Sequence, residues 1–166
     1  MKIKVFLVLL LVSLILPSIL AVDLEVQKES SDEVMIIDLN KPAVFDLSIK
    51  NNGPTDNFMI YTFFGSGSLP KEKFAISSGQ TRKIQFIVSP PYDDSKTGPV
   101  AFDYFIKGSD NSEYKSALNV KVINLNEAFE IGSADFDPES SSVEIYIKNK
   151  INFNFENLNV KFSSNF

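Results

Sequence analysis

The sequence predicts an all-β protein, and more specifically an immunoglobulin-like antiparallel β-sandwich, from three observations. Apolar and polar residues alternate with a period of two along most of the chain after residue 21. Clusters of glycine, proline, asparagine and serine interrupt these runs at short intervals, and no stretch after residue 21 carries an apolar stripe with helical spacing. About seven short strands within about 100 residues are typical of such a sandwich. An up-and-down barrel is the alternative, but the irregular loop lengths favour a sandwich.

The expected strands differ in how clearly their sequences mark them. Two short ones come first, around Leu24 to Val26 and around Val34 to Ile36. The clearest is AVFDLSIK, residues 43–50, in which apolar residues occupy one face and polar residues the other. The remaining strand-like runs are 58–64 (FMIYTFF), 83–89 (KIQFIVS), 100–107 (VAFDYFIK) and 117–123 (ALNVKVI).

The stretch SIKNNGPTDN, residues 48–57, follows the clearest strand and is a candidate binding loop by composition. Asp56 is its only acid, which is too few for a metal loop, and beyond Lys50 it has no basic residue to hold an anion. Asn52 and Gly53 tolerate a positive φ, and Pro54 restricts the exit from the loop. We therefore interpret it as a turn between strands, with positive φ expected at Asn52 and Gly53.

The first 21 residues form a segment of their own. Two lysines near the start precede an apolar run at residues 5–16, Pro17 ends it, and Ala21 offers a small residue for cleavage. This pattern predicts a secretory signal peptide over residues 1–21, so that the protein is secreted or held at the cell surface. The alternative is that residues 5–22 remain as an N-terminal membrane anchor, since such a run is just long enough to span a bilayer.

Composition excludes several classes of function. The sequence has no cysteine and no histidine, which rules out disulfides and any catalytic site or zinc site that needs these residues. The leader holds two of the 16 basic residues and none of the 21 acidic ones, so the rest of the chain has a formal charge of −7. A nucleic-acid partner is not expected, because a phosphate backbone requires a concentrated basic surface.

Glycine-rich and acidic stretches offer weak candidates for chemistry. FGSGS at 64–68 lacks the spacing of a phosphate-binding loop and is interpreted as a flexible connection. The carboxylates of Asp135, Asp137 and Glu139, and the adjacent pair Asp93 and Asp94, do not follow the frame of a calcium loop, so solvated acids are the expected role. Glycosidases use a pair of carboxylates that is held in a cleft, and the pattern of acidic residues in this sequence does not predict such a cleft. No enzyme activity, metal or cofactor is expected.

A short internal repeat predicts the domain organisation. FDLSIKN at 45–51 aligns with VEIYIKN at 143–149, an offset of 98 residues, which is about the length of one immunoglobulin-like domain. The same offset places Ile60, Thr62 and Phe64 opposite Leu158, Val160 and Phe162. We expect a sandwich at 22–123, a linker at 124–128 and a partial second repeat at 129–166. Such a partial repeat cannot bury its own apolar face, so it either begins a longer array or packs on another surface.

The run FMIYTFF carries the one candidate interaction surface. If Ile60 points inward, as its alignment with Leu158 predicts, then Met59, Tyr61 and Phe63 point outward. The corresponding residues of the second repeat, Asn157, Asn159 and Lys161, are all polar. An exposed stripe of Met59, Tyr61 and Phe63 indicates a surface for a partner or for a neighbouring domain. The alternatives are a loop that covers it, or a one-residue shift that reverses the two faces.

Three motifs in the first 123 residues resemble those of exported prokaryotic (archaeal and bacterial) immunoglobulin-like domains of the CARDB-like and NEW-type group. They are a strand that enters Asn-Asn-Gly at 51–53, a Ser-Gly-Gln turn at 78–80 before an apolar strand, and Gly98 before the strand at 100–106. The resemblance implies an extracytoplasmic spacer or interaction module without catalytic residues.

Together these observations predict a non-catalytic, exported structural, adhesion or protein-interaction module of the cell envelope. Its partner would be a protein or an adjacent domain at the cell surface. Two alternatives stay open: a carbohydrate-binding accessory domain of an envelope enzyme, and a membrane-anchored subunit whose sandwich faces outward. Exposed aromatic rings suit a sugar as well as a protein, although the chain has no tryptophan.

Overall fold

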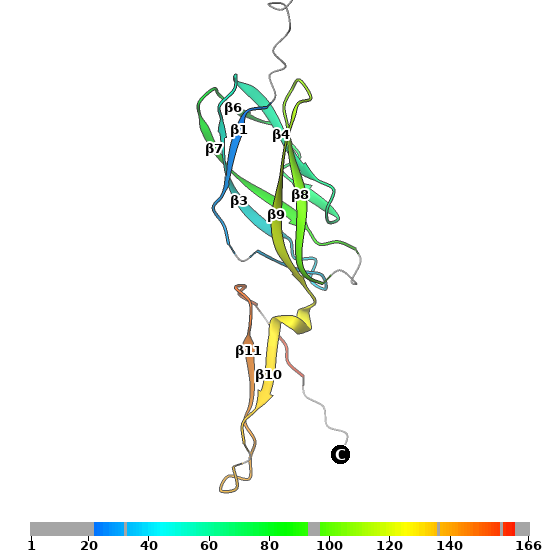
Figure 1. Ribbon diagram of the computed structural model, residues 1–166. Helices are drawn as coiled ribbons and strands as arrows, with labels where there is room; N and C mark the ends of the chain where they lie inside the picture. Colours follow the sequence, from blue (N-terminus) through cyan, green and yellow to red (C-terminus); the bar gives the residue numbers. More distant parts are fainter. Residues whose placement is uncertain (1–21, 32, 93–96, 136, 157, 162–166) are drawn as a thin grey trace, which may run out of the picture.

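A computed structural model describes residues 22–31, 33–92, 97–135, 137–156 and 158–161 (Figure 1). The predicted signal peptide or anchor, residues 1–21, lies outside the described residues. Within the described ranges, no helix has the length and apolar character needed to cross a membrane.

Most of the chain forms an immunoglobulin-like β-sandwich, which confirms the predicted fold class (Figure 1). All strand pairs are antiparallel except β2 with β9. The first sheet has the order β1 (Leu24–Lys28), β3 (Ala43–Asn51), β7 (Thr81–Ser89) and β5 (Gly67–Leu69). The second has the order β2 (Val34–Ile36), β9 (Glu113–Ile123), β8 (Gly98–Lys107), β4 (Asp56–Thr62) and β6 (Phe74–Ile76).

The core lies between the two sheets and follows the alternation in the sequence. Phe45, Leu47 and Ile49 on β3 are all buried, whereas Val44 and Lys50 on the same strand are exposed. Aromatic residues from both sheets meet in the centre, where the ring of Phe45 lies 5.7 Å from Phe102 and 6.4 Å from Phe86 between centroids. Each such side chain contributes about 1.5–3 kcal/mol by its removal from water, so the core holds the fold together in a chain without disulfides.

Two short strands were missed by the sequence prediction. β5 overlaps the end of the stretch expected to be a flexible connection and pairs with the end of β7, and β6 pairs with β4. The turn that leads into β5 depends on Gly65, whose φ is +76° and whose missing side chain leaves room for the carbonyl of Ser89. Three-residue strands are too short for a period of two to be recognised, so only their partners define them.

The turn after β3 is built differently from the prediction. Positive φ at Asn52 and Gly53 was expected and is wrong, because neither residue adopts it. Instead the buried side chain of Asn51 organises the turn. Its Nδ2 donates to the carbonyls of Pro54 at 2.6 Å and Ile76 at 3.0 Å, and its Oδ1 accepts the N–H of Gly53 at 3.0 Å. A buried amide with three hydrogen bonds therefore connects β3, the loop before β4 and the end of β6.

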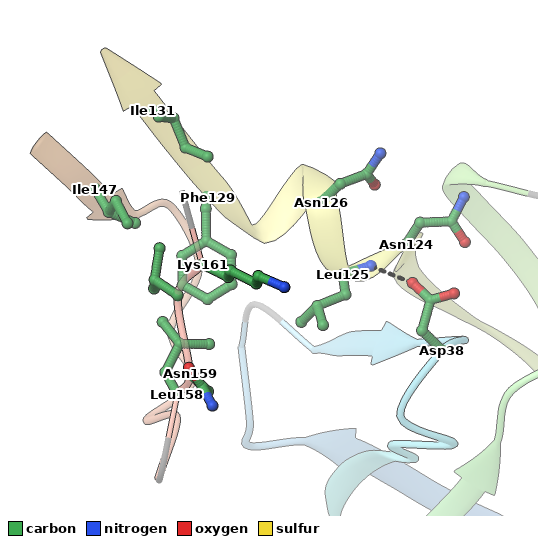
Figure 2. Close-up of a pocket in the computed structure, with 11 residues that line it drawn as sticks. Asp38, Asn124, Leu125, Asn126, Phe129, Ile131, Ile147, Leu158, Asn159 and Lys161 are labelled. Carbon is green, nitrogen blue, oxygen red and sulfur yellow. Dashed lines mark hydrogen bonds between the residues drawn. The ribbon is translucent and has the colours of Figure 1, made fainter. Parts of the chain in front are cut away.

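Beyond β9 the chain leaves the sandwich and forms a separate hairpin (Figure 1). The stretch predicted as a linker contains one 3-10 turn, η1 (Leu125–Ala128), and Asp38 accepts the N–H of Leu125 at 2.5 Å (Figure 2). The hairpin that follows consists of β10 (Phe129–Ser133) and β11 (Ile145–Asn149). A small second cluster joins hairpin and sandwich. Its buried members are Ile36, Ile123 and Ala128, and Val34, Leu125, Phe129, Ile151, Phe153 and Phe155 pack against them.

One buried carboxylate, Glu33, lies in the connection between β1 and β2. Lys28 Nζ is 2.8 Å from Glu33 Oε2, and Ser30 Oγ donates to Glu33 Oε1 at 2.5 Å. Ser30 Oγ also accepts the N–H of Asp46 at 3.0 Å, which ties this connection to β3. Burial raises the pKa of Glu33, but the hydrogen bonds from Lys28 and Ser30 outweigh it, and the pKa lies below its ordinary value of 4.5.

This arrangement predicts a pH-dependent contribution to stability. Because the folded pKa of Glu33 is depressed, its contribution is fully present above pH 4.5 and is lost as the pH falls through the folded pKa. We expect Glu33→Gln to be less stable than the wild type at pH 7, with the difference in melting temperature shrinking toward pH 3. Thermal unfolding followed by circular dichroism at both pH values tests this. An unchanged difference would mean that the charge of Glu33 plays no part.

Candidate interaction surface

The stripe predicted on FMIYTFF lies on the outer face of the second sheet. Phe58 and Ile60 are buried in the core, so the residues between and after them face away from it. Met59 and Tyr61 are half-buried, and Phe63, just after the end of β4, is 83% exposed. Phe63 therefore faces outward and is open among the described residues, whereas Met59 and Tyr61 are only partly exposed, and an interaction surface at the three residues stays a prediction.

Strand pairing adds a third aromatic side chain that the prediction did not include. β4 and β8 run antiparallel, and their register places Phe105 directly opposite Tyr61. The alternation of β8 turns Tyr104 and Ile106 into the core and leaves Phe105 on the outer face. The alternation was visible in the sequence, but the register that brings Phe105 beside Tyr61 was not. Tyr61, Phe63 and Phe105 together are called the aromatic cluster.

The three rings of the aromatic cluster contact one another. Tyr61 and Phe105 have centroids 5.3 Å apart and ring planes inclined by 19°, so the rings are stacked. Phe63 lies 5.6 Å from each of the other two rings and meets them edge-on, at 77° to Tyr61 and 62° to Phe105. Such geometry stabilises an aromatic pair by about 0.5–1.5 kcal/mol beyond its buried area, which orders the cluster before any partner arrives.

Charged residues of β8 and β9 border the aromatic cluster. The hydroxyl of Tyr61 donates to Glu113 Oε1 at 2.6 Å, and this hydrogen bond, together with burial, raises the pKa of Tyr61. Lys115 Nζ lies 5.7 Å from the centroid of Phe105 and 2.7 Å from Asp103 Oδ2. The surface thus has an apolar centre and a rim of both charges, an arrangement common in protein–protein interfaces.

Among the acidic residues considered for metal binding, Asp137 has a structural role. Asp137 accepts the N–H of Glu139 at 2.9 Å and the hydroxyl of Ser140 at 2.6 Å, which closes the tight turn of the β10–β11 hairpin. These hydrogen bonds lower the pKa of Asp137. Asp93 and Asp94 lie outside the described residues. Within the described part of the chain, three or more acidic residues do not gather around one point that a metal could occupy.

No protein-family model and no curated protein matches this sequence. Several solved structures are similar to it at low sequence identity. A FixG-related protein from Vibrio parahaemolyticus has a TM-score of 0.48 and 7% identity, over 60% of this chain and 94% of that one. A CARDB domain from Pyrococcus furiosus, solved in complex with di-metal ions, has a TM-score of 0.40 and 17% identity, over 63% of this chain and 96% of that one.

A beta-glucosidase from Listeria innocua is also similar, with a TM-score of 0.37 and 14% identity, over 62% of this chain but only 16% of the enzyme. A CARDB domain, the type of domain whose motifs this sequence resembles, is thus among the similar structures.

Proposed function

We propose that this protein is a non-catalytic interaction module of the cell envelope that binds a protein partner through the aromatic cluster. The observation that carries the proposal is the contiguous apolar patch of Tyr61, Phe63 and Phe105, in which Phe63 is 83% exposed. Aromatic residues of this kind are the usual anchors of protein interfaces. The pattern of residues 1–21 supports export, and the lack of histidine and cysteine supports a role without catalysis.

The directions of the rings favour a protein over a sugar. A carbohydrate stacks flat on an open ring face, but Tyr61 and Phe105 turn their faces toward each other. The ammonium group of Lys115 lies near the ring of Phe105 as well. Phe63 is the ring of the cluster that is mostly exposed, and it stands edge-on to both neighbours. A protein side chain can insert beside such rings, whereas a flat sugar platform would need several parallel faces.

We expect Phe63→Lys to weaken partner binding strongly without affecting the fold. Because Phe63 is mostly exposed, lysine at this position adds charge to the patch and leaves the core unchanged. An aromatic anchor contributes about 2 kcal/mol or more to binding, so affinity should fall at least about tenfold. The full chain carrying a photoreactive amino acid at position 63 is irradiated in an envelope preparation of the source organism, and cross-linked peptides are sequenced.

Tyr92 supplies the matched control, because it is an aromatic residue outside the aromatic cluster that is 90% exposed. The photoreactive amino acid at position 92 should not capture the same protein. Unlabelled wild type and Tyr92→Lys should compete with the probe at position 63, whereas Phe63→Lys should not. Equal competition by Phe63→Lys would contradict the proposal. If soluble cell-wall glycans compete and Phe63→Lys loses retention on them, the carbohydrate-binding alternative replaces it.

A further inference from the structure

The turn between β3 and β4 contains the one Asn-Gly pair of the sequence, Asn52 and Gly53. In such a pair the backbone nitrogen of the glycine can attack the side-chain amide of the asparagine, because glycine has no side chain that hinders the approach. Asn52 is exposed, so water reaches it. Asparagine is a thermolabile residue for this reason, and sequence and exposure alone favour loss of the Asn52 amide.

The reaction needs only water as a co-reactant. The nitrogen of Gly53 loses its proton and bonds to Cγ of Asn52, the bond from Cγ to the amide nitrogen breaks, and ammonia leaves with that proton. A succinimide ring then joins the two residues. Water adds to either carbonyl of the ring, which opens to aspartate or to isoaspartate. The attacking atom is therefore the backbone nitrogen of Gly53, and its surroundings set the rate.

Hydrogen bonds hold the backbone on both sides of the Asn52 side chain. The N–H of Gly53 donates to Asn51 Oδ1 at 3.0 Å, which keeps the attacking nitrogen protonated and directed at Asn51. The N–H of Asn52 donates to the carbonyl of Asp23 at 2.9 Å. Asn51 is 1% exposed, and its Nδ2 donates to the carbonyl of Ile76 at 3.0 Å, so its amide group is fixed. Gly53 must break its bond to Asn51 before it can attack.

We propose that Asn52 is a site of isoaspartate formation in this protein and that the buried side chain of Asn51 protects it. Isoaspartate adds an extra atom to the backbone between residues 52 and 53, so the bond from Gly53 to Asn51 cannot form again in the same turn. The product also adds a negative charge beside Asp23 and Asp56, which line a small cavity together with Asn51 and Gly53. The modification therefore weakens the connection of β3 with β4 and β6.

The first test needs no variant. The full chain is kept at mildly alkaline pH, once folded and once in guanidinium chloride, and peptide mapping by mass spectrometry measures the loss of the Asn52 amide and the isoaspartate formed. We expect Asn52 to react at least about tenfold more slowly in the folded chain, because the turn must open before Gly53 can attack. Equal rates in the folded and the unfolded chain would overturn the proposal.

Hydrogen exchange gives an independent measure of the same opening. The N–H of Gly53 must leave Asn51 Oδ1 both to exchange with water and to attack Asn52. NMR should therefore show a protected Gly53 amide in the folded chain, with exchange slowed by at least about tenfold. A Gly53 amide that exchanges as fast as in an unfolded chain would contradict the protecting role of Asn51.

Matched variants separate the contact of Asn51 from overall stability. Asn51→Ala removes the acceptor for Gly53, so Asn52 should react at least about tenfold faster than in the wild type. Val88→Ala truncates a buried residue of β7 that pairs with Ala43, at the far end of β3 from the turn. It should lower stability but change the rate at Asn52 less than about threefold. The same acceleration in both variants would overturn the proposal, as would none in Asn51→Ala.

A variant at Asn52 itself tests the consequence for stability. Wild type that has accumulated isoaspartate at residue 52 should unfold at a lower denaturant concentration than fresh protein, because the turn that Asn51 organises is lost. Asn52→Gln has a longer side chain, which closes a ring far more slowly, so the same treatment should leave its midpoint unchanged. An equal loss of stability in treated Asn52→Gln would show that Asn52 is not the site responsible.

Discussion

Phe45→Ala is expected to lower the free energy of unfolding by about 3–5 kcal/mol, the usual cost of truncating a buried phenylalanine. Phe45 is fully buried on β3, and its ring contacts Phe86 of the same sheet and Phe102 of the opposite sheet. Alanine would leave a cavity between the two sheets at the centre of the core. Urea unfolding followed by circular dichroism measures the change.

Val143→Ala is the matched control for this prediction. Val143 aligns with Phe45 at the 98-residue offset of the two similar sequence stretches, but it is 48% exposed. Truncation at such a position is expected to change the free energy of unfolding by about 0.5 kcal/mol or less. A comparable loss at both positions would show that Val143 is covered in solution, contrary to its exposure in the structure.

Asn51→Ala is expected to cost about 2–4 kcal/mol, although asparagine is polar and lies at the end of a strand. The side chain of Asn51 is 1% exposed, and its removal leaves the carbonyl of Ile76 and the N–H of Gly53 without their partners. Each unpaired buried group costs about 1–3 kcal/mol. Chemical unfolding of this variant should show a lower midpoint with an unchanged slope.

Two variants sharpen this prediction. Asn51→Asp keeps the acceptor for Gly53 but directs a carboxylate at the carbonyls of Pro54 and Ile76, so it should also destabilise the protein at neutral pH. Asn149→Ala, at the counterpart position, should cost less than about 1 kcal/mol, because Asn149 is exposed. Full stability of Asn51→Asp would show that the two donated bonds are unimportant.

The candidate surface shows what a sequence pattern can predict and what it cannot. Alternation along β4 was sufficient to predict that Met59, Tyr61 and Phe63 face outward, because successive side chains of a strand point to opposite faces. Phe105 was not predicted, since a period of two indicates a face but not a neighbour. Only the β4–β8 register places Phe105 against Tyr61 and turns a stripe on one strand into a cluster across two.

The turn after β3 shows the opposite case, in which local preference was overruled. Asn-Gly predicted positive φ, but the turn is organised by the contact of Asn51 with Ile76, 25 residues further along the chain. β5 and β6 are likewise defined by the strands they pair with. Contacts between residues distant in sequence leave no periodic trace, so such features could not be derived from composition or spacing.

The amino-acid order alone was enough for the all-β class and the main strands, because these depend on alternation and turn chemistry within a few residues. Three-dimensional folding decided the partners, namely which strands are neighbours and which aromatic side chains touch. The physical reason is that backbone hydrogen bonding is the same for every residue. The choice of which strands pair therefore depends on how the side chains of whole strand faces pack together. The face of β3 is buried in such packing, whereas residues on the face of β11 are exposed.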